Sequence, residues 1–248
     1  MDDLIFAILP GTCIICEAST HRKLDLCVKC ELELPWLNNA CLHCSIPLPD
    51  GNNVCGQCLF NKPPFTRCYS GFVYKYPIDR LILDFKENQK LLIGKLLATL
   101  LLKSFPENFT PPDLLVPIPL HKSALKKRGF NQSLEIAEVL SGNWSVPMDT
   151  RNCRRIVETT QQKSLHQKDR ANNIRGAFAI EKSYQGERIA IIDDVVTTGA
   201  TVTEFARLIL ANGAASTEVI CIARTPVQRT GQRSLTDQFL SRFEHQGG

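Results

Sequence analysis

One segment, residues 188–201, restricts the fold and the chemistry of this chain more than any other. Four apolar residues at 189–192 predict a buried strand, and two adjacent acids, Asp193 and Asp194, follow it. Two valines then lead into a Thr-Thr-Gly-Ala-Thr run at 197–201, after which a helical pattern begins. Backbone N–H groups and threonine hydroxyls at the start of a helix can surround a phosphate, because the helix dipole is positive there. The two carboxylates could accept hydrogen bonds from the vicinal hydroxyls of a ribose, so the segment indicates a site for a phosphorylated sugar.

A plainer interpretation is an acidic turn that only caps the following helix, as Asp and Thr often do. Capping needs one such residue, whereas this segment gathers two carboxylates and three threonine hydroxyls beside Gly199. Glycine at that position would let the backbone approach a phosphate without a Cβ in the way. We therefore favour a ligand site over a cap.

The whole run from 189 to 201 resembles the phosphoribosyl pyrophosphate (PRPP) signature of type I phosphoribosyltransferases. The resemblance implies that PRPP binds together with Mg²⁺. It implies contacts of PRPP with Asp193, Asp194, Val195, Val196, Thr197, Thr198, Gly199, Ala200 and Thr201. Asp193 and Asp194 would also be the catalytic residues, because their charge could stabilise an oxocarbenium-like transition state when pyrophosphate leaves.

Composition indicates a globular protein that stays in the cytoplasm. Of 248 residues, 44% are hydrophobic and 22% are charged. The longest apolar stretch, 91–102, is interrupted by Lys95 and is too short to cross a bilayer, so we expect no membrane insertion. The first ten residues are acidic where a signal peptide would be basic.

Charge is distributed unevenly along the chain. Residues 1–60 contain 3 Lys and Arg against 7 Asp and Glu, whereas residues 61–248 contain 26 against 18. A positive larger domain suits an anionic substrate such as a pyrophosphate, or a nucleic acid. An ordinary solvated basic surface explains the net charge of +4 equally well.

Eight of the 11 cysteines form four C-x-x-C pairs that repeat every 14 residues. The pairs are Cys13 and Cys16, Cys27 and Cys30, Cys41 and Cys44, and Cys55 and Cys58. This spacing is typical of zinc knuckles, two of which complete one four-cysteine site, so we expect two structural Zn²⁺ ions. Sequential pairing of the knuckles is the simplest arrangement, but an interleaved one remains open. Disulfides are disfavoured in a cytosolic protein, and an iron–sulfur cluster is a less favoured alternative.

Beyond residue 65, strand and helix patterns alternate. Strands are expected at 71–76, 113–119, 189–192 and 217–223, and helices from Pro77, at 91–102, at 131–141 ending at Gly142, and from 200 to Gly213. The pattern predicts an α/β fold with a mainly parallel sheet and flanking helices. We expect three parts: a double zinc ribbon at 1–65, a phosphoribosyltransferase-like domain at 66–225 and a loose polar tail at 226–248.

Two further segments could serve the site. In type I phosphoribosyltransferases the strand end that corresponds to Pro117, Ile118 and Pro119 contacts pyrophosphate, although two prolines also suit a rigid turn. Lys122 and Arg128, in the basic stretch 121–132, could stabilise the leaving pyrophosphate, unless this stretch is only a solvated helix start. The polar segment 151–175 lacks a clear period and is expected to be a long loop, either disordered or a mobile lid that could close over the bound substrate.

Taken together, the cysteine pairs and three motifs resemble the ComF family. The motifs are Arg128-Gly-Phe-Asn-Gln132, Thr159-x-x-Gln162-x-x-Leu165, and Arg170-x-x-Asn173-x-x-Gly176-x-Phe178. The resemblance implies a zinc ribbon ahead of a phosphoribosyltransferase domain, and a role in natural competence, where imported single-stranded DNA is handled.

Two functions follow from this resemblance. The first is a phosphoribosyltransferase with an unknown acceptor. The second is a non-catalytic module that senses PRPP or a nucleotide and binds single-stranded DNA or a competence protein. Aromatic residues, which help to bind single strands, make up only 7% of the chain, so the residues alone support DNA binding weakly.

Overall fold

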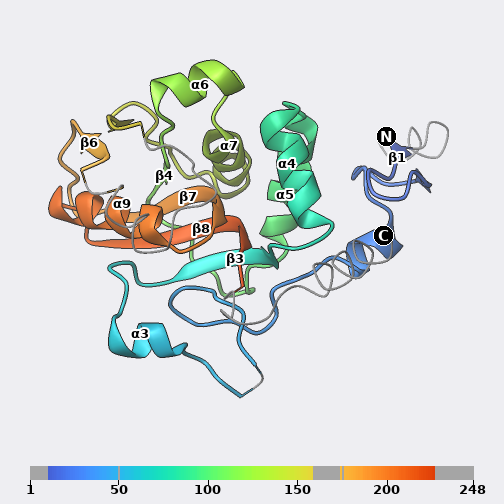
Figure 1. The fold of residues 1–248 in the computed structure, drawn as a ribbon, viewed down its shortest axis with the longest axis horizontal. Coiled ribbons are helices and arrows are strands. Elements are labelled where there is room, and N and C mark those ends of the chain that lie inside the picture. The colour runs from blue at the N-terminus through green and yellow to red at the C-terminus, as the bar shows by residue number, and fades with distance from the viewer. Residues whose placement is uncertain (1–10, 50, 159–173, 175, 227–248) are drawn as a thin grey trace, which may run out of the picture.

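The computed structural model describes residues 11–49, 51–158, 174 and 176–226 of the chain. Its centre is a four-stranded sheet in the order β3-β8-β7-β4, in which every neighbouring pair is parallel (Figure 1). The strands are β3 (Cys68–Val73), β4 (Leu114–Pro117), β7 (Arg188–Val196) and β8 (Ser216–Arg224). This arrangement confirms the expected α/β fold.

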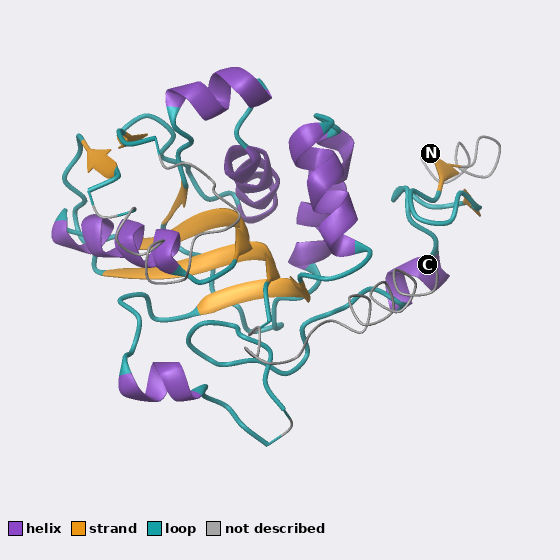
Figure 2. Cartoon of the chain, in the orientation of Figure 1, coloured by secondary structure: helices purple, strands orange, loops and turns teal. Residues whose placement is uncertain are grey.

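Helices cover both faces of the sheet (Figure 2). Alternate residues of β7 point to opposite faces, as the pleat of a strand requires. Ala190 and Ile192 join the core formed with α4 (Ile78–Glu87), α5 (Leu91–Leu102) and α7 (Gln132–Trp144). Ile189 and Ile191 join the opposite core, with α9 (Ala200–Ala211). Because both faces are buried, the strand consists of a continuous apolar run rather than an alternating one.

Several expected boundaries shift in the structure. β7 continues through both acids to Val196, so Asp193 and Asp194 lie within the strand rather than after it. β3 begins earlier than expected and ends at Val73. Our prediction that a helix ends at Gly142 is wrong, because α7 continues to Trp144 and is closed by Ser145 in the left-handed conformation. A glycine in an exposed helical turn costs too little to end the helix there.

The segment 151–175 is not wholly irregular. β5 (Cys153–Arg155) pairs antiparallel with β6 (Phe178–Ile180), a two-stranded unit that the polar composition concealed. Most of the expected lid, from 159 to 173, lies outside the described residues, as do residues 1–10 and 227–248. The motif residues Thr159, Gln162, Leu165, Arg170 and Asn173 fall in that range.

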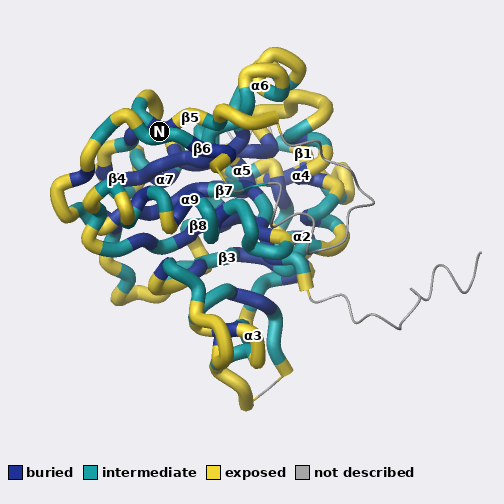
Figure 3. The backbone as a smooth tube through the Cα atoms, turned by 60° about the vertical axis from the view of Figure 1, so that its left-hand side comes forward, coloured by how far each residue is buried: buried dark blue, intermediate teal, exposed yellow. Residues whose placement is uncertain are grey.

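The cysteine-rich front end forms two small units along the chain. The first contains β1 (Gly11–Thr12), β2 (Ser19–Thr20) and α2 (Val28–Leu32). The second contains α3 (Gly56–Phe60), which projects away from the sheet (Figure 3). The chain between them runs beside β3, where Val73 N–H donates to Pro35 C=O at 2.9 Å and Leu37 N–H donates to Gly71 C=O at 3.0 Å.

The first unit packs into the larger domain. Leu26 and Leu34 belong to the same buried core as α5, and Glu31 pairs with Lys103 at 2.5 Å just after that helix. The second unit has a small core of its own around Cys41, Ile46 and Cys58. The boundaries 1–65, 66–225 and 226–248 remain a prediction. Within the described ranges, every helix is too short or too polar to cross a membrane.

The contact between α4 and α5 generates a stability prediction. A Cβ on Gly94 would lie 2.4 Å from the ring of Phe85, which is fully buried and has no room to move. We expect Gly94→Ala to destabilise the protein by about 1–3 kcal/mol, measured by urea unfolding. Gly142→Ala is the matched control, because its Cβ meets open space within α7. That variant should be stabilised by up to about 1 kcal/mol, and equal effects at the two glycines would contradict the packing argument.

Candidate functional site

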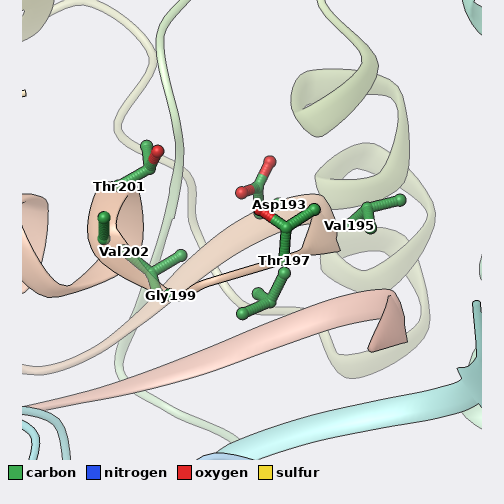
Figure 4. A pocket seen from close by; sticks show the side chains of 8 residues that line it. Asp193, Val195, Thr197, Gly199, Thr201 and Val202 are labelled. Carbon is green, nitrogen blue, oxygen red and sulfur yellow. The ribbon is translucent and has the colours of Figure 1, made fainter. Parts of the chain in front are cut away.

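The loop between β7 and α9 forms an open pocket. Gly199 has a φ of +81° and is the N-cap of α9, where it has no side chain to make a capping hydrogen bond. The hydroxyl of Thr198 accepts the Ala200 N–H at 3.3 Å, so one threonine of this segment does bond to the helix start. The pocket is small and is lined by Asp193, Val195, Val196, Thr197, Gly199, Ala200, Thr201 and Val202. Asp193 and Thr201 reach the same side of the loop that carries Gly199 (Figure 4).

The two acids have different surroundings. Asp193 lines the pocket, and its Oδ1 accepts bonds from the Asp194 N–H at 2.9 Å and the Ser133 hydroxyl at 3.4 Å. Asp194 is buried, and its Oδ1 accepts a bond from the Val195 N–H at 2.7 Å. Its Oδ2 lies 2.5 Å from Nζ of Lys86. Asp193 therefore has the more accessible carboxylate, and Asp194 is already paired.

Lys86 is a site residue that sequence reasoning missed. It lies in the last turn of α4, far from the motif along the chain, and only the packing of that helix brings it to Asp194. Burial alone would lower the pKa of Lys86, but the charges of Asp194 and Asp193 outweigh burial and raise it. The lysine therefore stays charged and neutralises one of the two acids.

Asp193 is the acid whose protonation responds to pH near neutrality. Burial and the neighbouring charge of Asp194 raise the pKa of Asp193 to about 7, against the opposing effect of Lys86. Arg155, in β5, is close enough for Asp193 to act on its pKa. The pocket thus combines a carboxylate that titrates near neutral pH with fixed positive charges.

The Pro117–Pro119 segment has little freedom to bind through its backbone. The Ile118 N–H donates to Ile192 C=O at 3.0 Å, and the Ile118 C=O accepts from Nδ2 of Asn131 at 3.0 Å. Proline has no N–H, so residues 117–119 leave no free backbone donor for pyrophosphate. Asn131 is also the N-cap of α7, where its Oδ1 accepts the Ser133 N–H at 3.1 Å.

The two candidate cations after this segment differ in position. α6 (Lys122–Arg128) is a separate short helix with no buried residue. Lys122 is exposed at its start, whereas Arg128 is half-buried at its end, where it donates to Oε1 of Gln132 at 3.1 Å. Arg128 also acts electrostatically on Lys86, so it belongs to the surroundings of the acids. The structure brings Arg128 to the site and leaves Lys122 on the surface.

The eight paired cysteines gather into two groups of four. Cys13, Cys16, Cys27 and Cys30 form one group, and Cys41, Cys44, Cys55 and Cys58 form the other. Within each group all Sγ atoms lie within 4.8 Å of one another. The knuckles therefore pair sequentially, and the interleaved alternative is wrong. Four sulfurs around one Zn²⁺ at about 2.3 Å stand about 3.8 Å apart, and the Sγ atoms of Cys16 and Cys27 are 3.7 Å apart.

Each group contains one cysteine whose pKa is lowered, Cys13 in the first and Cys41 in the second. Burial alone would raise the pKa of Cys13 and of Cys41, but backbone N–H groups outweigh it and lower both pKa values to about 6. Each group thus contains one thiol that ionises readily near neutral pH, which favours zinc binding. Four thiolates leave no open position for water, so these residues fit structural zinc sites.

A second residue that sequence reasoning missed is Arg224, the last residue of β8. It is 4% exposed, and its guanidinium donates to backbone carbonyls at the junction of β7 and α9 and in the second cysteine group. The sequence did not indicate these contacts, because Arg224 ends an apolar strand and its partners, Cys44 and Val196, lie far from it along the chain.

Comparison with known proteins identifies the family. The double zinc ribbon domain matches residues 4–59, and the phosphoribosyl transferase domain matches residues 125–242. The DNA utilization protein YhgH of Salmonella typhi is 36% identical over 168 residues, covering 66% of this chain and 74% of that protein. Competence protein F of Haemophilus influenzae is 30% identical over 159 residues, covering 61% of this chain and 69% of that protein.

The chain belongs to the ComF family. Competence protein ComFC of Bacillus subtilis shares 35% identity over 106 residues, which are 42% of this chain and 40% of that protein. The sheet of this ComF-family protein extends beyond the matched transferase region, because β3 and β4 precede residue 125. The expected combination of a zinc ribbon and a phosphoribosyltransferase-like domain is confirmed.

The cysteine geometry predicts about two zinc ions per chain in the purified protein, measured by atomic emission. Cys16→Ser and Cys44→Ser should each remove about one zinc, because each lies in a different group. A protein without zinc, or a single-site variant that loses both ions, would contradict two independent four-cysteine sites.

The raised pKa of Asp193 predicts a particular pH dependence of stability. The folded protein binds a proton at Asp193 up to about pH 7, whereas the unfolded chain releases it near pH 3.8. The contribution of this group to stability is therefore complete below pH 3.8 and is lost as the pH rises through 7. Urea unfolding should show Asp193→Asn more stable than wild type at pH 8, with the difference shrinking toward pH 4. A difference that grows on acidification would contradict this environment.

Proposed function

We propose that this ComF-family protein binds PRPP together with Mg²⁺ at the junction of β7 and α9. The observation that carries the proposal is the start of α9, whose N-cap Gly199 has no side chain and which shares a pocket with the carboxylate of Asp193. Of the first N–H groups of this helix, that of Ala200 is bonded to the Thr198 hydroxyl. Free N–H groups at a helix start attract a phosphate monoester, and a carboxylate accepts bonds from sugar hydroxyls. The matching phosphoribosyl transferase domain supports the same ligand.

In this proposal the 5′-phosphate lies on residues 197–201 and the ribose lies over the acids. Asp193, with the more accessible carboxylate, accepts the first hydroxyl. Asp194 accepts the second, which requires Lys86 to give up part of its contact with Oδ2. Released from that contact, Lys86 would hold its charge beside the departing pyrophosphate. Both acids would stabilise positive charge that develops on the ribose ring.

The pyrophosphate end of the ligand would lie toward Arg128. Its guanidinium is already near Lys86, and arginine binds phosphate oxygens through two parallel hydrogen bonds. Lys122 would add charge from the surface. Pro117, Ile118 and Pro119 would shape this end by contact rather than by donating N–H groups. Mg²⁺ would arrive with PRPP and neutralise part of the charge of the leaving group.

We further propose a role in natural transformation in the cytoplasm, in which the protein acts during the handling of imported single-stranded DNA. The support is the family, whose relatives are called competence protein F, competence protein ComFC and DNA utilization protein YhgH. Transfer of the phosphoribosyl group to an acceptor is the proposed activity. The alternative is a module that binds PRPP or a nucleotide without turnover and holds DNA or a competence protein.

Calorimetric titration of PRPP with Mg²⁺ into the zinc-loaded protein tests the proposal. Wild type should bind, and Thr201→Val should weaken the affinity by about tenfold because the hydroxyl that faces the pocket is lost. Thr203→Val is the matched control on the same helix, since Thr203 is not among the residues that line the pocket. Absence of binding by wild type would contradict the proposed site.

Release of pyrophosphate then separates an enzyme from a binding module. Wild type incubated with PRPP, Mg²⁺ and candidate acceptors should release pyrophosphate, and Asp193→Ala should abolish that release. Binding without release, with any acceptor supplied, would support the sensing alternative instead.

A further inference from the structure

Arg224 is a buried arginine whose partners are backbone carbonyls rather than an acid. Its Nη1 donates to Val196 C=O at 2.9 Å, to Thr197 C=O, and to Thr225 C=O at 3.1 Å. Its Nε donates to Cys44 C=O at 2.8 Å. Among the described residues, no carboxylate is within ion-pair distance of this guanidinium. A buried charge is costly unless hydrogen bonds satisfy it, so these four carbonyls are what hold Arg224 in place.

The bonds to Val196 and Thr197 fix the direction of the N–H groups that follow. A trans peptide is planar, and its C=O and N–H point in opposite directions. Because the carbonyls of Val196 and Thr197 point toward Arg224, the N–H groups of Thr197 and Thr198 point away from it. These are the first amides of the loop that we assign to the 5′-phosphate. The guanidinium also places a positive charge behind that loop, which favours an anion in front of it.

The same guanidinium reaches the second cysteine group. Cys44 supplies one of the four Sγ atoms of that group, while its carbonyl accepts the Arg224 Nε bond. This knuckle also lies close to β3, because the Ser45 hydroxyl donates to Cys68 C=O. Ser45 is buried and has a φ of +53°, so this knuckle is held in one conformation against the end of the sheet. One side chain therefore contacts both the knuckle and the phosphate-facing loop.

We propose that Arg224 is a positioning residue that orients the phosphate-binding amides and couples them to the second zinc site. This inference rests on the proposed function, because it assumes that residues 197–201 hold the phosphate of PRPP. With zinc bound, Cys44 and its carbonyl are fixed, so the guanidinium keeps the loop carbonyls turned away from the ligand. Without that zinc, the knuckle is free to move, and Arg224 loses one of the partners that hold it. Zinc in the second site thus favours the binding conformation of the loop, whereas zinc in the first site does not.

Substitution of Arg224 tests the first part. Arg224→Met should weaken the affinity for Mg²⁺-PRPP by at least about tenfold, since it removes hydrogen bonds from a charged group. Arg224→Lys keeps the charge and some of the bonds, so it should recover part of the affinity. Arg188→Met is the control, because Arg188 pairs with Asp113 at the opposite end of β7. That variant should change the affinity by no more than about twofold.

An amide readout distinguishes positioning from general loss of structure. In nitrogen-15 spectra of folded protein, the Thr197 and Thr198 amide signals should shift on addition of PRPP to wild type. In Arg224→Met those two shifts should shrink, while the spectrum of the remaining sheet stays that of wild type. Equal ligand shifts in the two proteins would overturn the positioning role. If Arg224→Met is unfolded, the comparison is made with Arg224→Lys. Wild-type affinity and wild-type ligand shifts in that variant would likewise overturn the positioning role.

Two matched cysteine variants test the coupling to zinc. Cys27 and Cys55 occupy equivalent places, since each is the N-cap of a short helix and its Sγ accepts the N–H three residues later. Each should cost about one zinc per chain when changed to Ser. Cys55→Ser should weaken PRPP binding severalfold, and Cys27→Ser should leave it near the wild-type value. Equal effects of the two variants, or none from Cys55→Ser after its zinc is lost, would overturn the coupling.

The failures can be told apart. If wild type binds no PRPP, the proposed function fails and this inference fails with it. If wild type binds PRPP and Arg224→Met binds equally well, the proposed function stands and the positioning role alone is rejected.

Discussion

The proposed phosphate site depends on one constraint, that the start of α9 leaves its first N–H groups facing outward. Gly199 permits it by adopting a positive φ and by having no side chain of its own over the helix start. Arg224 holds the Thr197 carbonyl from behind, and it shares the Val196 carbonyl with the Thr225 N–H, which donates to it at 3.1 Å. The parallel sheet supports this arrangement, because Val196 at the end of β7 pairs with Arg224 at the end of β8. The site is thus prepared before any ligand arrives.

The acids next to this loop show how one sequence motif can give two environments. Asp193 and Asp194 are adjacent, so in a strand their side chains leave on opposite sides. One reaches the pocket, while the other meets Lys86 from a helix on the opposite face. The result is a carboxylate with a pKa of about 7 beside an acid that is ion-paired with Lys86. Binding of PRPP with Mg²⁺ would change the charge and the hydrogen bonds around both acids. Without that ligand, Asp194 is paired with Lys86 and Asp193 is not.

The sequence predicted those features whose physics is local. The strands and helices follow from the apolar runs, and the turn before the helix from 200 follows from Gly199. The zinc knuckles follow from the C-x-x-C spacing. The sequential pairing of the knuckles required the structure, because equal spacing permits both arrangements. Lys86 and Arg224 were missed because their meaning depends on contacts with residues more than 25 positions away. Likewise, the pairing of β5 with β6 crosses a polar segment that has no strand periodicity.

The central claim is that residues 197–201 hold the phosphate of a pentose while Asp193 holds its hydroxyls. A crystal of the zinc-loaded protein soaked with ribose 5-phosphate tests this most directly. We expect electron density for the monoester within hydrogen-bond distance of the Thr198 to Thr201 amides, and for the ring over Asp193. Density for the phosphate on the basic surface of α6, with the β7–α9 loop empty, would contradict the account.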